Sequence, residues 1–254
     1  MKPGKSFIIW FSPRSGSTLL CKALEATGQA GKAGEFLNIP EGNNFLDHYK
    51  VDDFAMLKEK LWSMGTSLNG IFGVKYSLYY IHYASIIKPL AGMQGIESQI
   101  EFDWAIFSDL FPNCHHIYLT RRNKIRQAVS WWKAIQNQLW HLEQGQEEVT
   151  PPNFYDDKYD FDALTHLFKE INLREAAMES FFFQNQIIPT PVIYEDFIRD
   201  YENTIYFLLT AMQIETKDLE IGPKPLKKTA NGQSELWVQR FRKDLQTDWD
   251  RVMW

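Results

Sequence analysis

Short apolar runs alternate along this chain with longer segments in which apolar residues recur at helical spacing. The apolar runs are bounded by turn residues and predict buried strands at Phe7–Phe11, Ile71–Tyr76, His115–Leu119 and Pro191–Tyr194. The segments between them predict helices, because their apolar positions recur every three or four residues. These helices are expected at Leu19–Leu24 with Gly28 as the C-terminal cap, Asp53–Met64, Tyr79–Leu90, Ser98–Phe111, Ile125–Leu139, Phe161–Phe183 and Tyr201–Met212, and from Ser234 as N-cap through Phe241.

The alternation of strands with helices predicts a three-layer α/β fold, in which a mainly parallel central sheet is flanked by helices. The 254 residues suffice for one sizeable core and contain no convincing linker, so we expect a single domain over residues 1–254. The polar stretch Gln144–Asp160 predicts a long loop. A lid over a site and a loop without function fit this stretch equally well.

The charge of the chain excludes some partners and favours others. A net charge of −5 argues against nonspecific binding to nucleic acid, because the surface has no overall positive field. The basic residues gather instead in two local clusters, which on an acidic protein indicate a small polyanionic ligand. These clusters are Arg121, Arg122, Lys124 and Arg126, and later Lys224, Lys227 and Lys228.

Two cysteines, Cys21 and Cys114, are too few for a disulfide framework and are compatible with a reducing compartment. The first apolar run is too short for a signal peptide or a membrane span. We therefore expect a cytoplasmic protein without stable membrane insertion.

The loop from Ser12 to Thr18 is the first candidate site. It joins a predicted strand to a predicted helix, and the unpaired N–H groups at the start of such a helix bind anions. In the usual nucleotide-triphosphate loop a Lys follows the last glycine, and the next hydroxyl holds magnesium. Here Ser17 follows Gly16 directly, and the cation is Arg14. The loop thus predicts a phosphate or sulfate site that requires no metal; the alternative is a serine-rich turn that caps a core helix, with Arg14 in solvent.

A second site of the same plan follows the third predicted strand. Arg121 and Arg122 stand at the strand end, and Arg126 and Ser130 share a face of the next helix. Lys75, at the end of the second strand, is either a further site residue or a cation that reaches solvent. Two anion sites at strand ends, with a late basic loop, fit a ligand with two separated phosphates, such as adenosine 3′,5′-bisphosphate.

These motifs resemble sulfotransferases that use 3′-phosphoadenosine 5′-phosphosulfate (PAPS), and most of all the bacterial branch typified by trehalose 2-sulfotransferase. The resemblance runs from about residue 7 to about residue 243 and implies a P-loop-like fold, PAP as product and a homodimer. It is carried by Phe11–Leu20, Gly34–Phe36, Arg121–Arg122 with Gln127–Ser130, and Ser234–Val238.

The resemblance also implies roles for single residues. The 5′-phosphosulfate would be held by five loop residues, Arg14, Ser15, Gly16, Ser17 and Thr18. Of these, Arg14 would also offset charge on the bridging oxygen. Ser130 with either Arg121 or Arg122 would hold the 3′-phosphate, and the spacing leaves the choice of arginine open. Tyr194 would lie near the adenine, and Lys228 would close over the 3′-phosphate.

Glu35 matches the carboxylate proposed as the general base in the trehalose branch. A sugar or alcohol hydroxyl is a poor nucleophile, so the reaction needs a group that takes its proton. A solvated carboxylate is a weak base, which leaves three histidines as rivals: His48, His82 and His141.

The acceptor side departs from the branch. Lys32 stands where the trehalose enzyme has a sugar-contacting Glu, which suggests a different acceptor, one with a negative charge of its own. We expect a hydroxyl on a carbohydrate or glycolipid, with Lys32, Glu35 and Lys75 as acceptor-binding residues. Two alternatives stay open: a P-loop-type kinase with Asp196 as a magnesium ligand, and a noncatalytic protein that binds adenosine bisphosphate and has no need of Glu35.

Overall fold

The fold is organised around a sheet of parallel strands. The computed structural model describes residues 2–40, 42–78, 82–98, 100, 102–147, 154–155, 157–247 and 249. Within them, the sheet has the order β2-β1-β3-β4, and every neighbouring pair is parallel. The strands are β1 (Lys5–Phe11), β2 (Ile71–Tyr76), β3 (Cys114–Thr120) and β4 (Thr190–Ile193). This confirms the predicted mainly parallel sheet.

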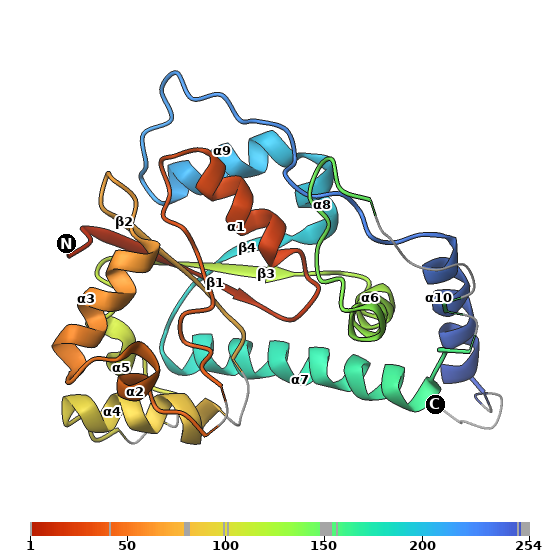
Figure 1. Cartoon of the computed structure of the whole chain (residues 1–254), viewed down its shortest axis with the longest axis horizontal. Helices are drawn as coiled ribbons and strands as arrows, with labels where there is room; N and C mark the ends of the chain where they lie inside the picture. The colour runs from red at the N-terminus through yellow and green to blue at the C-terminus, as the bar shows by residue number, and fades with distance from the viewer. Residues whose placement is uncertain are drawn as a thin grey trace.

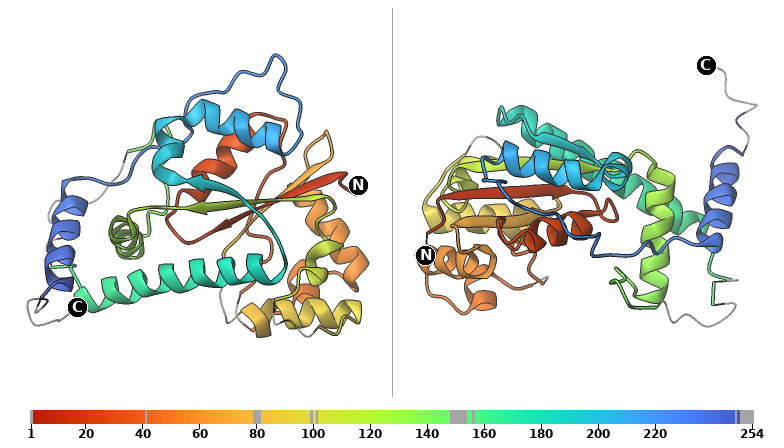
Figure 2. Two further views of the ribbon diagram at one scale, coloured as in Figure 1. Left: turned by 180° about the vertical axis from the view of Figure 1, so that it is seen from behind. Right: turned by 90° about the horizontal axis from the view of Figure 1, so that it is seen from above.

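Helices cover both faces of the sheet (Figures 1 and 2). One face carries α1 (Ser17–Ala26), α8 (Tyr194–Arg199) and α9 (Tyr201–Ala211). The other face carries α2 (Phe45–Tyr49), α3 (Phe54–Gly65), the π-helical turn η1 (Tyr83–Ile87), α4 (Lys88–Gln94), α5 (Ala105–Ser108) and the long α7 (Phe161–Gln184). Beyond the carboxyl ends of the strands lie α6 (Lys124–Asn137) and α10 (Gly232–Leu245) (Figure 1).

The strand β1 lies between two hydrophobic cores. Phe7 and Ile9 pack under α1, α8 and α9, whereas Ile8 and Trp10 pack toward α3, α4, α5 and the end of α7. Successive side chains of a strand point to opposite faces, so one run of apolar residues serves both cores. Each fully buried side chain of this size stabilises the fold by about 1.5–3 kcal/mol. The strand end that carries the loop Ser12–Gly16 is therefore held rigidly.

Two helices differ from the sequence predictions. In place of a helix over 98–111, the helix α5 covers only Ala105–Ser108. Before it, Asp103 accepts hydrogen bonds from Ser98 Oγ and from the backbone N–H of Ala105, and such local bonds compete with helix formation. The other prediction, Tyr79–Leu90, begins in residues 79–81, which lie outside the described residues. The helix that follows, α4, runs past the predicted end and stops at Gly95 in the left-handed region.

The cap of the last helix is also different. Asn231, and not Ser234, is the N-cap of α10. The Asn231 side chain accepts from Ser234 N at 3.1 Å, and Ser234 Oγ accepts from Asn231 N at 3.3 Å. This reciprocal arrangement is a capping box, in which the N3 residue also serves as an acceptor. The C-cap of α1 is Thr27, and Gly28, the next residue, has the left-handed conformation that the sequence predicted, with φ 66°.

The predicted loop Gln144–Asp160 is described only in part, because residues 148–153 and 156 lie outside the described residues. The start of this segment is bonded to the loop 224–230, since Gln144 N donates to Pro225 O at 3.3 Å. Just before it, Leu142 O accepts from Lys227 N at 2.8 Å. Near its end, Tyr155 is buried against Trp237. Among the helices of the described residues, none has the length and the apolar character that a bilayer crossing requires.

Candidate active site at the carboxyl ends of the strands

The loop between β1 and α1 is shaped by two residues with positive φ. Arg14 has φ 66° and Gly16 has φ 97°. A Cβ atom at Gly16 would lie 2.5 Å from Cδ2 of Tyr194, so only glycine fits here. Gly16 also precedes α1 without any side-chain cap. The N–H groups of the first turn of α1 thus lack a side-chain acceptor, as at helix ends that bind anions.

A first cavity of about 700 Å³ opens in front of this loop. It is lined by the start of α1, by Arg121 and Tyr194 at the ends of β3 and β4, by Ser130 of α6 and by the late loop 224–230. Its charged lining consists of six cations and two carboxylates: Arg14, Arg121, Arg126, Lys224, Lys227 and Lys228 against Glu195 and Glu235. Such a lining fits a ligand with several negative charges.

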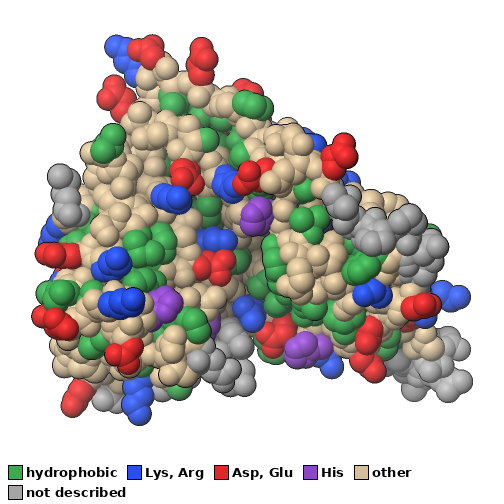
Figure 3. All heavy atoms as spheres, in the orientation of Figure 1, with side chains coloured by type: hydrophobic (Ala, Val, Ile, Leu, Met, Phe, Trp, Pro, Cys, Tyr) green, Lys and Arg blue, Asp and Glu red, His purple; other side chains and the backbone are tan. Residues whose placement is uncertain are grey.

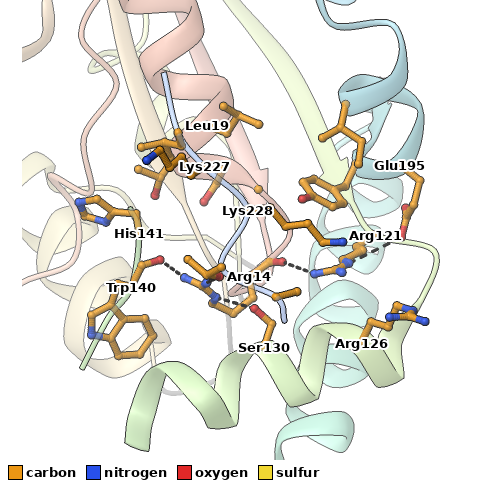
Figure 4. Close-up of a pocket in the computed structure, with 18 of the residues that line it drawn as sticks. Arg14, Leu19, Arg121, Arg126, Ser130, Trp140, His141, Glu195, Lys227 and Lys228 are labelled. Carbon is orange, nitrogen blue, oxygen red and sulfur yellow. Dashed lines mark hydrogen bonds and ion pairs between the residues drawn. The ribbon is translucent and has the colours of Figure 1, made fainter. Parts of the chain in front are cut away.

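Arg14 lies at the centre of the first cavity (Figure 4). Its Nε donates to Ser130 Oγ at 3.1 Å, one terminal nitrogen donates to the carbonyl oxygen of Trp140, and the other donates to Thr229 Oγ1 at 3.4 Å. Burial, followed by the nearby Arg121, lowers the pKa of Arg14 to about 10. The guanidinium is therefore still charged at neutral pH, and a bound anion would relieve the repulsion between the two arginines.

Arg121 and Arg122 have different surroundings. Arg121 lines the first cavity, stacks on Tyr194 at 4.8 Å and donates to Arg14 O at 3.4 Å. Burial is the main reason why the pKa of Arg121 is lowered. The Arg122 side chain is 57% exposed, pairs with both carboxylate oxygens of Asp196 and is not among the residues that line the cavity. Of the two arginines, Arg121 therefore contacts the loop between β1 and α1 and lines the first cavity, and Arg122 does not line it.

Three buried polar atoms in this region have no hydrogen-bond partner among the described residues: the donors Ser15 Oγ and Arg121 Nε, and the acceptor Gln127 Oε1. The contact of Arg121 Nε with Glu195 Oε1 measures 3.6 Å and is an ion pair too long for a hydrogen bond. Buried polar groups are normally satisfied. Unsatisfied donors beside an excess of cations fit a polyanion, and Lys228 extends from the late loop toward Arg121 (Figure 4).

A second cavity, of about 1070 Å³, adjoins the first. Five residues line both cavities and form their common wall: Arg14, Ser17, Thr18, Trp140 and His141. The face drawn in Figure 3 is hollowed near its centre, and basic, acidic and histidine side chains gather around the hollow. A group bound in one cavity therefore lies next to a group bound in the other.

Glu35 lines the second cavity and is held by the end of β2. Gly34 forms a parallel bridge with Val74, and Lys75 N donates to Gly34 O at 2.9 Å, which fixes the backbone beside Glu35. Lys75 Nζ lies 2.8 Å from Glu35 Oε1 and 3.4 Å from Thr18 Oγ1. Lys75 thus connects the carboxylate with the helix start at the common wall, as its place at a strand end suggested.

The three histidines occupy different positions. His141 lines both cavities, and His82 lines only the second. Burial, with a smaller effect of Arg174, lowers the pKa of His82 to about 4. His48 is exposed on α2 beside Tyr49 and lines neither cavity.

Lys32 lies apart from both cavities. Its side chain is 70% exposed and pairs with Glu25 at 3.8 Å, and neither cavity counts it in its lining. We therefore leave Lys32 out of the site developed below.

Sequence reasoning missed a buried network beneath the loop. The Glu175 carboxylate of α7 accepts from Ser12 Oγ at 2.8 Å and from Thr120 Oγ1 at 3.0 Å, and it pairs with Lys124. Gln127 Nε2 donates to Ser12 Oγ and to Pro13 O, each at 2.8 Å. The network ties the ends of β1 and β3 to α6 and α7. The one available signal was a carboxylate inside the amphipathic pattern of 161–183.

Comparison with known proteins identifies the family. A profile of the Stf0 sulphotransferases matches residues 6–244. The chain belongs to this family. As a Stf0 sulphotransferase it is an enzyme, which confirms the expectation drawn from the loop and strand-end motifs.

Relatives of this Stf0 sulphotransferase match over nearly the whole chain. It is 26% identical to trehalose 2-sulfotransferase of Mycolicibacterium smegmatis over 96% of both chains. It is 24% identical to trehalose 2-sulfotransferase of Mycobacterium tuberculosis over 94% of both chains. A crystal structure of a sulfotransferase from Alicyclobacillus acidocaldarius matches 96% of this chain and 93% of its own, with a TM-score of 0.50 and 12% identity. This last likeness bears on the fold alone, and it agrees with the predicted P-loop-like architecture.

Proposed function

We propose that this enzyme transfers the sulfuryl group of PAPS to a hydroxyl of a carbohydrate or glycolipid acceptor and releases PAP. One observation carries the proposal. A strongly cationic cavity and a cavity that contains Glu35 share the wall formed by Arg14, Ser17, Thr18, Trp140 and His141. In-line transfer between two substrates needs such adjacency.

The donor would occupy the first cavity. The loop residues Arg14 to Thr18 would hold the 5′-phosphosulfate, and Arg121, Ser130 and Lys228 would hold the 3′-phosphate. The choice of Arg121 is supported by its burial in the cavity lining, whereas Arg122 pairs with Asp196 outside it. Tyr194 would contact the adenosine. When bound, PAPS supplies the activated sulfuryl group, and Arg14 with the uncapped start of α1 would stabilise negative charge that develops on the leaving phosphate.

The acceptor would occupy the second cavity, with Glu35 as the general base. Lys75 orients this carboxylate through their 2.8 Å contact, and a carboxylate within hydrogen-bond reach of a hydroxyl can act as a general base. The names of the two mycobacterial relatives support a carbohydrate as the acceptor. His82, whose pKa burial lowers to about 4, is no stronger a base than an ordinary carboxylate, while His141 at the common wall is the rival that an experiment must test.

The kinase alternative is disfavoured by the surroundings of Asp196. Its carboxylate is bound by Arg122 and Arg199, and it does not line the cavity in front of the loop. A magnesium ligand would have to leave both arginines. Among the described residues, groups of three or more acidic, His or Cys side chains able to hold a metal ion are absent.

Ligand-induced stabilisation separates the alternatives. We expect PAP to raise the melting temperature progressively with concentration, because it binds the folded protein only, and ATP with magnesium to raise it much less. Equal or greater stabilisation by magnesium-ATP would favour a kinase. PAP binding without transfer of label from PAPS to any of a panel of sugars and glycolipids would favour the noncatalytic alternative.

Variants of Glu35 test the base. Glu35→Gln should lower the transfer rate by a factor of about 10² to 10⁴, while PAP still stabilises the protein. Glu25→Gln, on the exposed side of α1, is the matched control with transfer unchanged. If Glu35→Gln transfers normally and His141→Gln does not, the proton acceptor is His141.

Two further expectations stay predictions. A homodimer is implied by the resemblance, and the 86% exposed Phe183 on α7 is an apolar group that such an interface could cover. Light scattering on the purified enzyme measures the mass. The cytoplasmic location is tested by fractionation of the producing cells.

A further inference from the structure

The second cavity carries more positive charge than a neutral sugar requires. Of the described residues that line it, three are cations and one is a carboxylate: Arg14, Lys75 and Arg174 against Glu35. Two of these cations already have tasks at the common wall. Arg14 is bound to Ser130 and Trp140, and Lys75 is paired with Glu35. Arg174 takes no part in either arrangement.

Arg174 is held in place from three sides. Its Nε donates to Glu170 Oε2 at 3.2 Å, one terminal nitrogen donates to Ser77 Oγ at 3.1 Å, and the guanidinium lies 5.4 Å from the ring centre of Trp131. Its side chain is only 15% exposed. A guanidinium fixed in this way loses little conformational entropy when it binds a ligand.

The charge of Arg174 acts inside the second cavity. Glu170, its ion-pair partner, is not among the lining residues, whereas Arg174 itself is. His82 lines the same cavity, and Arg174 contributes to the lowering of the pKa of that imidazole. At neutral pH His82 is therefore uncharged and adds no positive charge of its own to the cavity.

The remaining lining suits a sugar ring. Trp131 and Trp140 offer aromatic surface, and Asn38, Ser77 and Ser85 offer polar groups. Ligand sites typically combine aromatic walls with a few placed polar groups. A guanidinium beside a tryptophan adds a fork that matches the two oxygens of a carboxylate or phosphate.

We propose that Arg174 and Trp131 form a subsite for an oxyanion group on the acceptor, so that the sulfated sugar is itself anionic. The inference rests on the proposed function and names its substrate class. Lys32, the cation that first suggested a charged acceptor, is not part of this subsite. A purely structural Arg174, which only ties α7 to the end of β2, would show no preference for charge in the acceptor.

The test compares pairs of sugars that differ in one anionic group. Binding to the PAP-loaded enzyme is measured by calorimetry for trehalose 6-phosphate against trehalose, and for methyl glucuronide against methyl glucoside. We expect at least one anionic member to bind tenfold or more tightly than its neutral partner, and the pair that does so identifies phosphate or carboxylate as the group. Equal affinities in both pairs would overturn the proposal.

Variants locate the subsite. Arg174→Gln should reduce the anionic-to-neutral affinity ratio to within twofold, and Arg174→Lys should restore part of it. Lys169→Gln removes a charge from the exposed face of the same helix and should keep the full ratio. Retention of the full ratio in Arg174→Gln would overturn the assignment to Arg174. If Arg174→Gln fails to fold, the comparison of acceptors on the wild-type enzyme still decides whether the enzyme prefers an anionic acceptor.

The melting temperature with PAP separates this inference from the proposed function. A protein that PAP does not stabilise contradicts the donor assignment. A protein that PAP stabilises, but that has no preference for charged acceptors, contradicts only the subsite.

Discussion

At the scale of single residues, Arg14 shows what the sequence can and cannot predict. The absence of a Lys after Gly16 indicated a loop whose cation is Arg14, and the structure places this guanidinium at the wall between both cavities. Its acceptors could not be foreseen, because Ser130, Trp140 and Thr229 lie between 116 and 215 residues away in the chain. The spacing of residues within a short segment can predict which side chain serves a loop. It cannot predict hydrogen-bond partners that lie far away in the chain.

The choice between Arg121 and Arg122 gives a prediction at this scale. Arg121→Gln should weaken PAP binding by about 10- to 100-fold, because a hydrogen bond to a charged group contributes roughly 1.5–3 kcal/mol. Arg122→Gln removes an exposed ion pair and should change the affinity by less than about twofold. Calorimetric titration with PAP measures both. A larger loss in Arg122→Gln would reverse the assignment of the 3′-phosphate.

At the scale of elements, the strands could be predicted from the sequence, whereas the buried network below the loop could not. Apolar runs bounded by turns are a strong signal for buried parallel strands, and all four strands were found. The predicted helix over 98–111 is longer than α5, because the pattern of apolar residues does not reveal the hydrogen bonds that Asp103 accepts. Glu175 falls on the apolar face of the helical pattern over 161–183, but the pattern does not reveal its partners. Its burial depends on Ser12, Thr120 and Lys124, which arrive from other elements.

Removal of the Glu175 charge tests the network. Glu175→Gln should lower the free energy of unfolding by about 3 kcal/mol, because it leaves Lys124 without its counter-charge in a largely buried place. The double variant Glu175→Gln with Lys124→Met should recover part of this loss. Urea unfolding measures all three proteins. If the single variant is as stable as the wild type, the network does not stabilise the fold.

At the scale of the whole molecule, the site lies where parallel strands end, as the alternation of elements predicted. The order β2-β1-β3-β4 makes β1 and β3 neighbours, so the loop after one strand meets the arginine after the other. The acceptor side was less predictable. Lys32 is exposed and lines neither cavity. Arg174 and Trp131 come from α7 and α6, helices whose packing no local pattern reveals.

Stability of the whole molecule should fall in mild acid. Burial, with a smaller effect of His115, lowers the pKa of His116 from 6.5 to about 4. Its Nδ1 accepts from Trp10 Nε1 at 3.1 Å, a bond that protonation of Nδ1 would break. Above pH 6.5 both the folded and the unfolded chain are neutral at this site. Between pH 6.5 and 4 only the unfolded chain takes the proton, so folding stability decreases, by on the order of 2 kcal/mol.

Denaturant unfolding at several pH values measures this loss. His116→Gln keeps an acceptor for Trp10 but does not titrate, so its stability should decrease less between pH 6.5 and 4 than that of the wild type. Parallel pH profiles of the two proteins would contradict the role of His116.

The close approach of Gly16 to Tyr194 links two parts of the molecule that the chain itself keeps far apart. A methyl group at Gly16 would push the Tyr194 ring aside, and that ring carries the guanidinium of Arg121. The smallest possible side chain in the loop would thus disturb both ends of a bound nucleotide at once. Because the positive φ of Gly16 disfavours a side chain even where space is made, position 16 should remain glycine across related sequences, including those with a smaller residue at position 194.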